Sequence, residues 1–346
     1  MTLVRPGARA PFCYGMSTNR TFYSFDAQAG RAAVVIVADG IGEDVLRPMI
    51  GEFVQHSAAF AALNTDIVLL GNEDVVRQLD ATLPAVSGIQ LIDCSSGILT
   101  ERAIVFVVDR NLRVAMRSDA TAFVVPACLR CVEALPREPS CDVTMPAPVL
   151  VLPHLLTRAM CDQLIERFES SPTVDGGIAS IDRDGRPCTK VDHSKKHRRD
   201  MLISPDDPLH DPVRAILLDC CAPEMAKAFH AEIRHIDRLL LARYDAPGGK
   251  FLRHRDNRGK NVAFREFALS VNLRREAFDG GHVSFPEYND HRYAAPTGTG
   301  MIFSSSLLHE ATEVTRGHRY VLLTFLHGDA AEARRLAYEA EMVGIG

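Results

Sequence analysis

The first 135 residues alternate short apolar runs with amphipathic stretches. Residues 32–38 (AAVVIVA) are apolar throughout and rich in β-branched side chains, which is the pattern of a strand buried on both faces. The predicted elements are, in order, a strand at 32–38, a helix at 45–63, a strand at 66–70, a helix at 73–79, a hairpin at 103–116 and a helix at 127–135. This alternation predicts a small α/β domain.

A proline-rich stretch follows, and the pattern then changes. Residues 136–148 (PREPSCDVTMPAP) contain four prolines, which remove backbone donors and exclude regular structure. Beyond them we expect a strand at 149–152, helices at 157–169 and 212–233, and short strands at 238–244, 251–254, 267–273, 282–285, 300–303 and 320–326. Short strands separated by turn residues predict an all-β sandwich or barrel. The expected organisation is a domain at 1–135, a linker at 136–148 and a second domain at 149–346.

Composition narrows the class of protein. The chain has 346 residues, 47% of them hydrophobic, and a formal net charge of -5, so it has no global basic field that would attract nucleic acid or an anionic membrane. It has no apolar run of about 18 residues and no apolar leader segment, so we expect no membrane span and a cytoplasmic location. Nine scattered cysteines indicate thiols in a reducing compartment rather than a disulfide framework.

Two metal-binding residue types follow the strand predicted at 251–254. His254 and Asp256 are two residues apart, and side chains at i and i+2 of an extended chain point the same way. His309 comes 55 residues later, just after the strand predicted at 300–303. Two imidazoles and one carboxylate on one face of an octahedral ion are the ligands of non-haem Fe(II) oxygenases, and they leave three positions open. An H-x-D pair is common by chance, so the surrounding residues decide its meaning.

An ordered set of motifs surrounds these three residues. It consists of PVLVLP at 148–153, CDQLI at 161–165, Tyr244, GGKF at 248–251, HRD at 254–256, FDGG at 278–281, FP at 285–286, Pro296, Gly298, Gly300, Phe303, His309, Val314, Gly317 and Arg319. In this order, residues 148–328 resemble the prolyl 4-hydroxylase-like branch of the Fe(II)- and 2-oxoglutarate-dependent oxygenases. The resemblance implies a double-stranded β-helix (jelly roll) with supporting helices.

The resemblance also implies a reaction. Fe(II) and 2-oxoglutarate would be bound, O2 would be consumed, and an unactivated C–H bond would be hydroxylated while 2-oxoglutarate becomes succinate and CO2. Related halogenases replace the carboxylate ligand with a small residue, so Asp256 favours hydroxylation. The resemblance allows ascorbate as an auxiliary reductant and a homodimer as the assembly.

Roles follow residue by residue from the same resemblance. His254, Asp256 and His309 match the iron ligands. Arg319 matches the basic residue that pairs with the far carboxylate of 2-oxoglutarate, and a guanidinium can bind a carboxylate through two parallel hydrogen bonds. Tyr244 matches a tyrosine that hydrogen-bonds the same carboxylate, and Asn272 matches another pocket residue. His318 is the alternative to Arg319, although strand alternation would direct it to the other face.

The N-terminal part has a resemblance of its own. The segments PGARAPF at 6–12, AAVVIVADG at 32–40 and RAIVFVVDRNLRV at 102–114 resemble the peroxiredoxin-like group of thioredoxin folds. That group has its peroxidatic cysteine after the first core strand, where this sequence has DGIGED at 39–44. The resemblance implies a thioredoxin-like domain without peroxidase chemistry, which would serve packing, dimerisation or substrate presentation.

Several alternatives remain open from the sequence. The leading prediction is an α+β two-domain hydroxylase that acts on a small molecule or amino-acid derivative. The alternatives are a prolyl hydroxylase acting on a protein or peptide, a thiol redox protein or sensor using the N-terminal domain, and a non-catalytic scaffold. The basic run at 190–199 (KVDHSKKHRR) is interpreted as a solvated mobile loop, or else as a lid that contacts an anionic group of the substrate.

Overall fold

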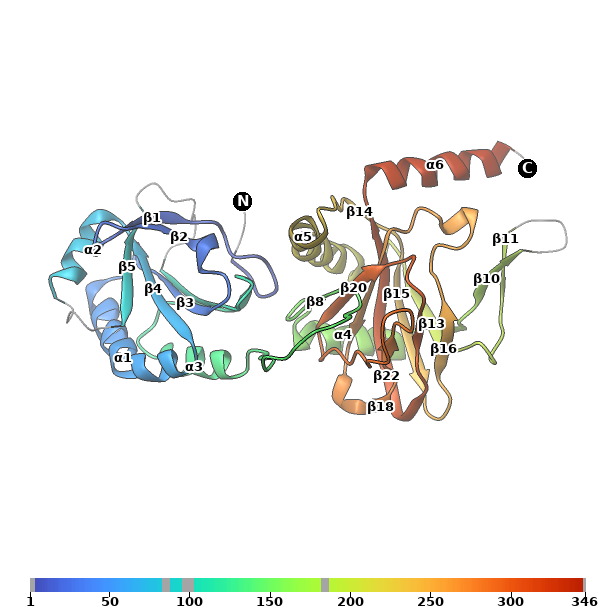
Figure 1. Cartoon of the computed structure of the whole chain (residues 1–346), viewed down its shortest axis with the longest axis horizontal. Coiled ribbons are helices and arrows are strands. Elements are labelled where there is room, and N and C mark those ends of the chain that lie inside the picture. The colour runs from blue at the N-terminus through green and yellow to red at the C-terminus, as the bar shows by residue number, and fades with distance from the viewer. Residues whose placement is uncertain (1–3, 83–87, 95–102, 182–186, 345–346) are drawn as a thin grey trace. The chain divides into compact units, whose positions relative to one another are not determined.

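The chain folds into two compact units. The computed structural model describes residues 4–82, 88–94, 103–181 and 187–344. The units are Met1–Pro139 and Ser140–Gly346, and the boundary between them falls inside the proline-rich stretch 136–148 (Figure 1). No helix within the described ranges is both long enough and apolar enough to cross a membrane.

The N-terminal unit is built on one mixed sheet. Its strands lie in the order β2-β1-β5-β4-β3-β6-β7, with β3, β4 and β5 parallel and the other pairs antiparallel. The strands are β1 (Tyr14–Ser17), β2 (Phe22–Ser24), β3 (Ala32–Val37), β4 (Thr65–Gly71), β5 (Ile89–Asp93), β6 (Ile104–Val108) and β7 (Val114–Asp119). The sequence predicted β3, β4 and the β6–β7 hairpin, but not β1, β2 or β5.

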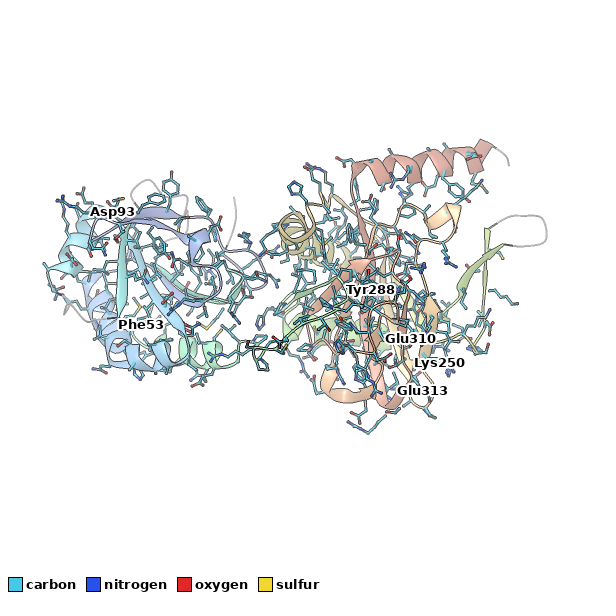
Figure 2. The ribbon with its side chains drawn as sticks, viewed as in Figure 1. Phe53, Asp93, Lys250, Tyr288, Glu310 and Glu313 are labelled. Carbon is cyan, nitrogen blue, oxygen red and sulfur yellow. The ribbon has the colours of Figure 1, made fainter. Side chains whose placement is uncertain are left out.

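Both faces of this sheet are covered. Helices α1 (Glu43–Ala62) and α3 (Val125–Glu133) pack on one face (Figure 1). Phe53 of α1 (Figure 2) belongs to the same buried cluster as Val34 and Ile36 of β3. The alternate residues of β3 pack on the other face against Phe25 and the N-terminal segment. Helix α2 (Glu73–Asp80) links β4 to β5. Burial on both faces explains why β3 is apolar at every position.

The C-terminal unit contains two antiparallel sheets. The larger has the order β8-β20-β17-β22-β15-β13-β9, with β14 and β18 also pairing with β22, and the smaller has the order β12-β16-β21-β19. The strands of the larger sheet are β8 (Val149–Leu152), β9 (Val174–Asp175), β13 (Arg199–Ile203), β14 (His235–Ile236), β15 (Leu239–Asp245), β17 (Phe267–Asn272), β18 (Phe278–Gly280), β20 (Gly300–Ser304) and β22 (Val314–His327). Those of the smaller sheet are β12 (Lys196–His197), β16 (Lys250–His254), β19 (Val283–Ser284) and β21 (His309–Ala311).

The core of this unit lies between the two sheets. Val283 of β19 packs with Ala268 of β17 and Phe303 of β20, and Ala311 of β21 packs with Ala242 of β15. The helices are α4 (Arg158–Glu169), α5 (His210–Phe229) and α6 (Asp329–Gly344), and a separate hairpin is formed by β10 (Ile178–Ile181) and β11 (Pro187–Lys190). Two antiparallel sheets enclosing one core are consistent with the predicted jelly roll.

Three sequence predictions need correction. The basic run does not form a continuous mobile loop, because Lys196 and His197 form β12 and residues from Arg199 onward form β13. The second helix ends at Phe229 rather than 233, because His230 adopts a left-handed conformation with φ 55. The strand predicted at 320–326 is the second half of the 14-residue β22.

A tight turn before β20 provides a test of this packing. Gly298 has φ +71, and a Cβ added there would lie 2.2 Å from the backbone oxygen of Leu156. We therefore expect Gly298→Ala to lower the free energy of unfolding of the C-terminal unit by at least about 2 kcal/mol. Urea unfolding followed by circular dichroism would measure this, since the chain has no tryptophan.

Gly51, where we expect an alanine substitution to stabilise the protein, serves as the comparison. Gly51 lies inside α1, and an added Cβ there meets nothing within 4 Å. Gly51→Ala should stabilise the N-terminal unit by about 0.5–1 kcal/mol. Equal effects of the two substitutions would contradict the stated role of the turn.

Candidate metal and cosubstrate site

The two histidines are brought together by strand pairing. His254 is the last residue of β16 and His309 is the first of β21, and the two are cross-strand partners. Their ring centroids are 4.3 Å apart. Asp256 follows two residues after β16 ends, and its backbone N–H donates to the oxygen of Ser305 at 2.9 Å. Residues far apart in sequence therefore meet at one end of the smaller sheet.

The ligand atoms face a common point. The Asp256 carboxylate oxygens lie 3.4 Å from Nε2 of His254 and 3.3 Å from Nε2 of His309. One potential ligand atom from each residue lies within 4.8 Å of the others. Atoms bound at about 2.1 Å to one ion, at right angles, are about 3 Å apart. The two carboxylate–imidazole separations are therefore close to those of a facial set of three ligands on a divalent cation.

Backbone carbonyls orient both imidazoles. Nδ1 of His254 lies 2.7 Å from the oxygen of Leu252, and Nδ1 of His309 lies 2.9 Å from the oxygen of Leu307. A carbonyl oxygen can only accept, so each Nδ1 carries the proton and each Nε2 presents a lone pair. This is the tautomer that a metal-binding histidine requires.

Electrostatics favour the same ligand states. Burial would raise the pKa of Asp256, but the adjacent His254 and His309 outweigh it and hold the pKa below its ordinary value. Burial lowers the pKa of His309, against the opposing effect of Asp256. A deprotonated carboxylate and a neutral imidazole are the forms that bind a cation.

A cavity of about 420 Å³ opens beside these residues. Its wall includes Tyr244 of β15 and Arg319 of β22, which are cross-strand partners. Arg319 is 2% exposed, and its guanidinium carbon lies 5.0 Å from the centre of the Tyr244 ring. This volume is within the range of small-ligand sites.

Asn272 positions Arg319 rather than lining the cavity. Its Oδ1 accepts from Nε of Arg319 at 3.1 Å, and its Nδ2 donates to the oxygen of Ala295 at 2.8 Å. Asn272 is buried and is not among the residues that line the cavity. Asn272 therefore contacts Arg319, which lines the cavity, and does not line the cavity itself.

Arg319 is a buried cation without an ion pair. Within the described part of the chain, no carboxylate lies at ion-pair distance from its guanidinium. Burial lowers the pKa of Arg319, yet a guanidinium stays protonated at neutral pH. A buried charge of this kind is costly unless an anion pairs with it.

Two further cations in the cavity wall come from the basic run 190–199, in which the sequence analysis singled out no individual residue. Lys196 and Arg198 are only 4% and 6% exposed, and both line the cavity. Arg198 donates to the Tyr244 hydroxyl at 2.9 Å, and Asp200 lies close to both basic side chains. Burial, and next the charge of Arg198, lower the pKa of Lys196 to about 7. The signal in the sequence was the spacing of two between these three residues, which puts them on one side of an extended segment.

The remaining neighbours of the predicted site face elsewhere or pair with acids. His318 is 57% exposed, and its Nδ1 lies 2.7 Å from Asp245. It is therefore on the opposite side of β22 from Arg319, as strand alternation predicts. Arg255 lines the cavity and pairs with Glu287 at 3.0 Å.

Comparison with known proteins finds sequence similarity to PKHD-type hydroxylases. The chain is 26% identical over 209 residues to a PKHD-type hydroxylase of Xanthomonas campestris pv. campestris, a match covering 56% of this chain and 86% of that protein. It is also 26% identical over 179 residues to a PKHD-type hydroxylase of Burkholderia cenocepacia, covering 49% and 74%. No model of a known protein family matches the chain.

Solved structures give a weaker likeness. A Pseudomonas putida prolyl-4-hydroxylase matches with a TM-score of 0.38 at 16% identity, covering 53% of this chain and 94% of that one. A viral collagen prolyl hydroxylase from Paramecium bursaria Chlorella virus-1, as its 2OG complex, matches with a TM-score of 0.37 at 16% identity, covering 51% and 94%.

Proposed function

We propose that the C-terminal unit is an Fe(II)- and 2-oxoglutarate-dependent dioxygenase that hydroxylates an unactivated C–H bond. The observation that carries this proposal is the convergence of His254, Asp256 and His309 beside a cavity that contains the buried cation Arg319. The sequence similarity to PKHD-type hydroxylases supports it. We further propose a small molecule or amino-acid derivative as substrate, and a protein or peptide prolyl group as the alternative.

Each part of the site has a task in this proposal. The three ligands would hold Fe(II), and Arg319 with Tyr244 would bind the far carboxylate of 2-oxoglutarate. When bound by these three residues, Fe(II) would supply the activation of O2 that couples the conversion of 2-oxoglutarate to succinate and CO2 with hydroxylation of the substrate. The apolar residues Leu240 and Leu323 in the cavity wall keep water from the reacting groups. Ascorbate as a reductant and a cytoplasmic location remain part of the proposal.

The N-terminal unit is proposed to be a thioredoxin-like domain without a peroxidatic cysteine. The strand order β4-β3-β6-β7, with β3 parallel to β4 and antiparallel to β6, supports this interpretation. Helix α1 follows β3 after the segment 38–42 (ADGIG), which contains no cysteine. A redox or sensor function would therefore have to use other thiols. Packing, dimerisation and substrate presentation are the roles we propose.

Formation of the metal–cosubstrate complex tests the proposed function. Anaerobic addition of Fe(II) and 2-oxoglutarate to the full-length protein should produce a visible metal-to-ligand charge-transfer band. Succinate in place of 2-oxoglutarate should give no band, because it has no keto group to complete a chelate. EDTA should remove the band, and with O2 present it should stop succinate production from 2-oxoglutarate.

The result that would overturn the proposal is equally direct. A folded wild-type protein that takes up no Fe(II), or gives no band with Fe(II) and 2-oxoglutarate together, would exclude the oxygenase function.

A further inference from the structure

The wall of the cavity carries far more positive than negative charge. Eight lysine or arginine side chains line it, against two acidic ones, Asp256 and Glu310. Glu310 lies on β21, next to the strand β16 that contains Lys250 (Figure 2), and it pairs with Arg253 at 3.5 Å. Asp256 is already engaged by the two histidines. The lining acids therefore neutralise little of the basic charge.

Carboxylates just outside the lining neutralise only part of the rest. Lys196 and Arg198 share the single carboxylate of Asp200, at 3.6 Å and 2.7 Å. Arg265 pairs with Asp237 at 2.9 Å, and Arg255 pairs with Glu287 at 3.0 Å. Among the residues that the structure describes, neither Arg238 nor Arg258 has a carboxylate at ion-pair distance.

Arg238 and Arg319 mark opposite ends of the cavity. Arg238 immediately precedes β15, whereas Tyr244, the partner of Arg319, lies six residues further along. At about 3.3 Å per residue this separation is about 20 Å. Residues an even number apart on a strand face the same side, so Arg238, Leu240 and Tyr244 all line the cavity.

The Arg238 end is also the end with the metal ligands. The N–H of Asp256 donates to Ser305, and the N–H of Ser305 donates to Glu266, the residue after Arg265. Strand pairing gives the same placement: Phe267, two residues after Arg265, pairs with Ser304 of β20 and with Leu326 of β22. Leu326 in turn pairs with Ile236, two residues before Arg238. Arg238 and Arg265 thus lie on the metal side of the cavity, away from the pocket of Arg319.

Binding of Fe(II) and 2-oxoglutarate would not neutralise the excess positive charge of the cavity wall. Fe(II) and the dianion of 2-oxoglutarate carry opposite charges of equal size, so together they add no net charge. The far carboxylate of 2-oxoglutarate would use Arg319. Arg238 lines the cavity but is exposed, and it has no ion-pair partner among the described residues, so it is available to bind a second anion. The space beside the metal ligands is where the group to be oxidised must lie.

Resting on the proposed function, we propose that the substrate is an oxyanion, a carboxylate or a phosphate, whose charged group binds Arg238 beside Arg265. This places the anionic group at the metal end of the cavity and the C–H bond to be hydroxylated between it and the metal ligands. Arg238 acts in binding and orienting the substrate, and it has no part in holding 2-oxoglutarate.

The test uses the full-length protein saturated with Fe(II) and 2-oxoglutarate under anaerobic conditions. The probes are inorganic phosphate and a panel of N-acetyl amino acids, each compared with its own carboxamide. Binding is measured by calorimetry and by the shift of the charge-transfer band. We expect phosphate or at least one acid to bind at least about tenfold more tightly than the neutral amides, since a hydrogen bond to a charged group contributes about 1.5–3 kcal/mol. The comparison of phosphate with the acids identifies which oxyanion is preferred.

Variants locate the binding. Arg238→Gln should weaken binding of the anionic probe about tenfold or more and leave the affinity for 2-oxoglutarate unchanged, and Arg238→Lys should restore part of the loss. Arg234→Gln is the matched control, because Arg234 is 59% exposed and is not part of the cavity wall. Arg234→Gln should bind the anionic probe and 2-oxoglutarate with wild-type affinity.

The outcomes separate this inference from the proposed function. If the charge-transfer band forms but no anion binds better than its amide, or Arg238→Gln binds the anion as wild type does, the anionic substrate is excluded and the oxygenase remains. If the wild-type band does not form, the proposed function fails and this inference fails with it.

Discussion

His309→Ala is expected to abolish the Fe(II)–2-oxoglutarate chromophore and to lower 2-oxoglutarate turnover by more than about 100-fold. Loss of a group that merely supports a metal ligand costs about 10–100-fold, so loss of a ligand should cost more. His309 is one of three ligand candidates, and its side chain is only 8% exposed between Asp256 and the aromatic ring of Phe303. Iron content, the anaerobic spectrum and succinate release measure the effect.

His318→Ala is the matched control for this substitution. It removes the same kind of side chain from β22, the next strand along the chain, at a position that is 57% exposed and turned away from the cavity. Its activity and iron content should stay within about twofold of wild type. Wild-type iron content and an intact band in His309→Ala would remove His309 from the ligand set.

The second large effect is expected at Arg319. Arg319→Gln should raise the KM for 2-oxoglutarate by at least about 30-fold, because breaking a buried, hydrogen-bonded charge pair costs about 2–5 kcal/mol. Glutamine keeps polar contact with Asn272 but has no charge to offer the cosubstrate. The KM of Arg319→Lys for 2-oxoglutarate should lie between those of wild type and Arg319→Gln, since an ammonium keeps the charge but not the two parallel donors.

An exposed arginine on the same strand controls for this change. Arg316 is 65% exposed and pairs with Asp279 on β18. Arg316→Gln should leave the KM for 2-oxoglutarate as it is in wild type. If Arg319→Gln also leaves it unchanged, the cosubstrate carboxylate binds elsewhere in the cavity, and Arg198 becomes the next residue to test.

The predictions that succeeded from the sequence rest on local periodicity and on residue order. The apolar run at 32–38 is short and rich in β-branched residues, which favours a strand buried on both faces, and residues 32–37 form β3. The sequence predicted that His254 and Asp256 face one point, and they do, although Asp256 lies in the turn after β16 rather than on the strand. That His309 joins them is a matter of pairing between β16 and β21, and only the order of the surrounding motifs indicated it.

What the sequence did not show depends on tertiary contacts. Lys196 and Arg198 belong to a strongly polar run, and periodicity alone assigns such a run to solvent. They are nevertheless buried, because Lys196 donates to the oxygen of Gly177 and lies near Asp200, and Arg198 donates to the hydroxyl of Tyr244. Likewise, nothing local reveals that Asn272 contacts Arg319, since the two residues meet only through pairing of β17 with β22.

The way in which the two imidazoles are held has a consequence for how this protein can change over generations. Each Nδ1 proton goes to a main-chain oxygen two positions earlier, at Leu252 and Leu307, and every amino acid supplies that oxygen. Mutations that replace these leucines, or the basic residues around the cavity, therefore leave the orientation of the two imidazole rings unchanged. Residues of the cavity wall can therefore change during evolution, and with them the substrate, while the proposed metal centre keeps its geometry.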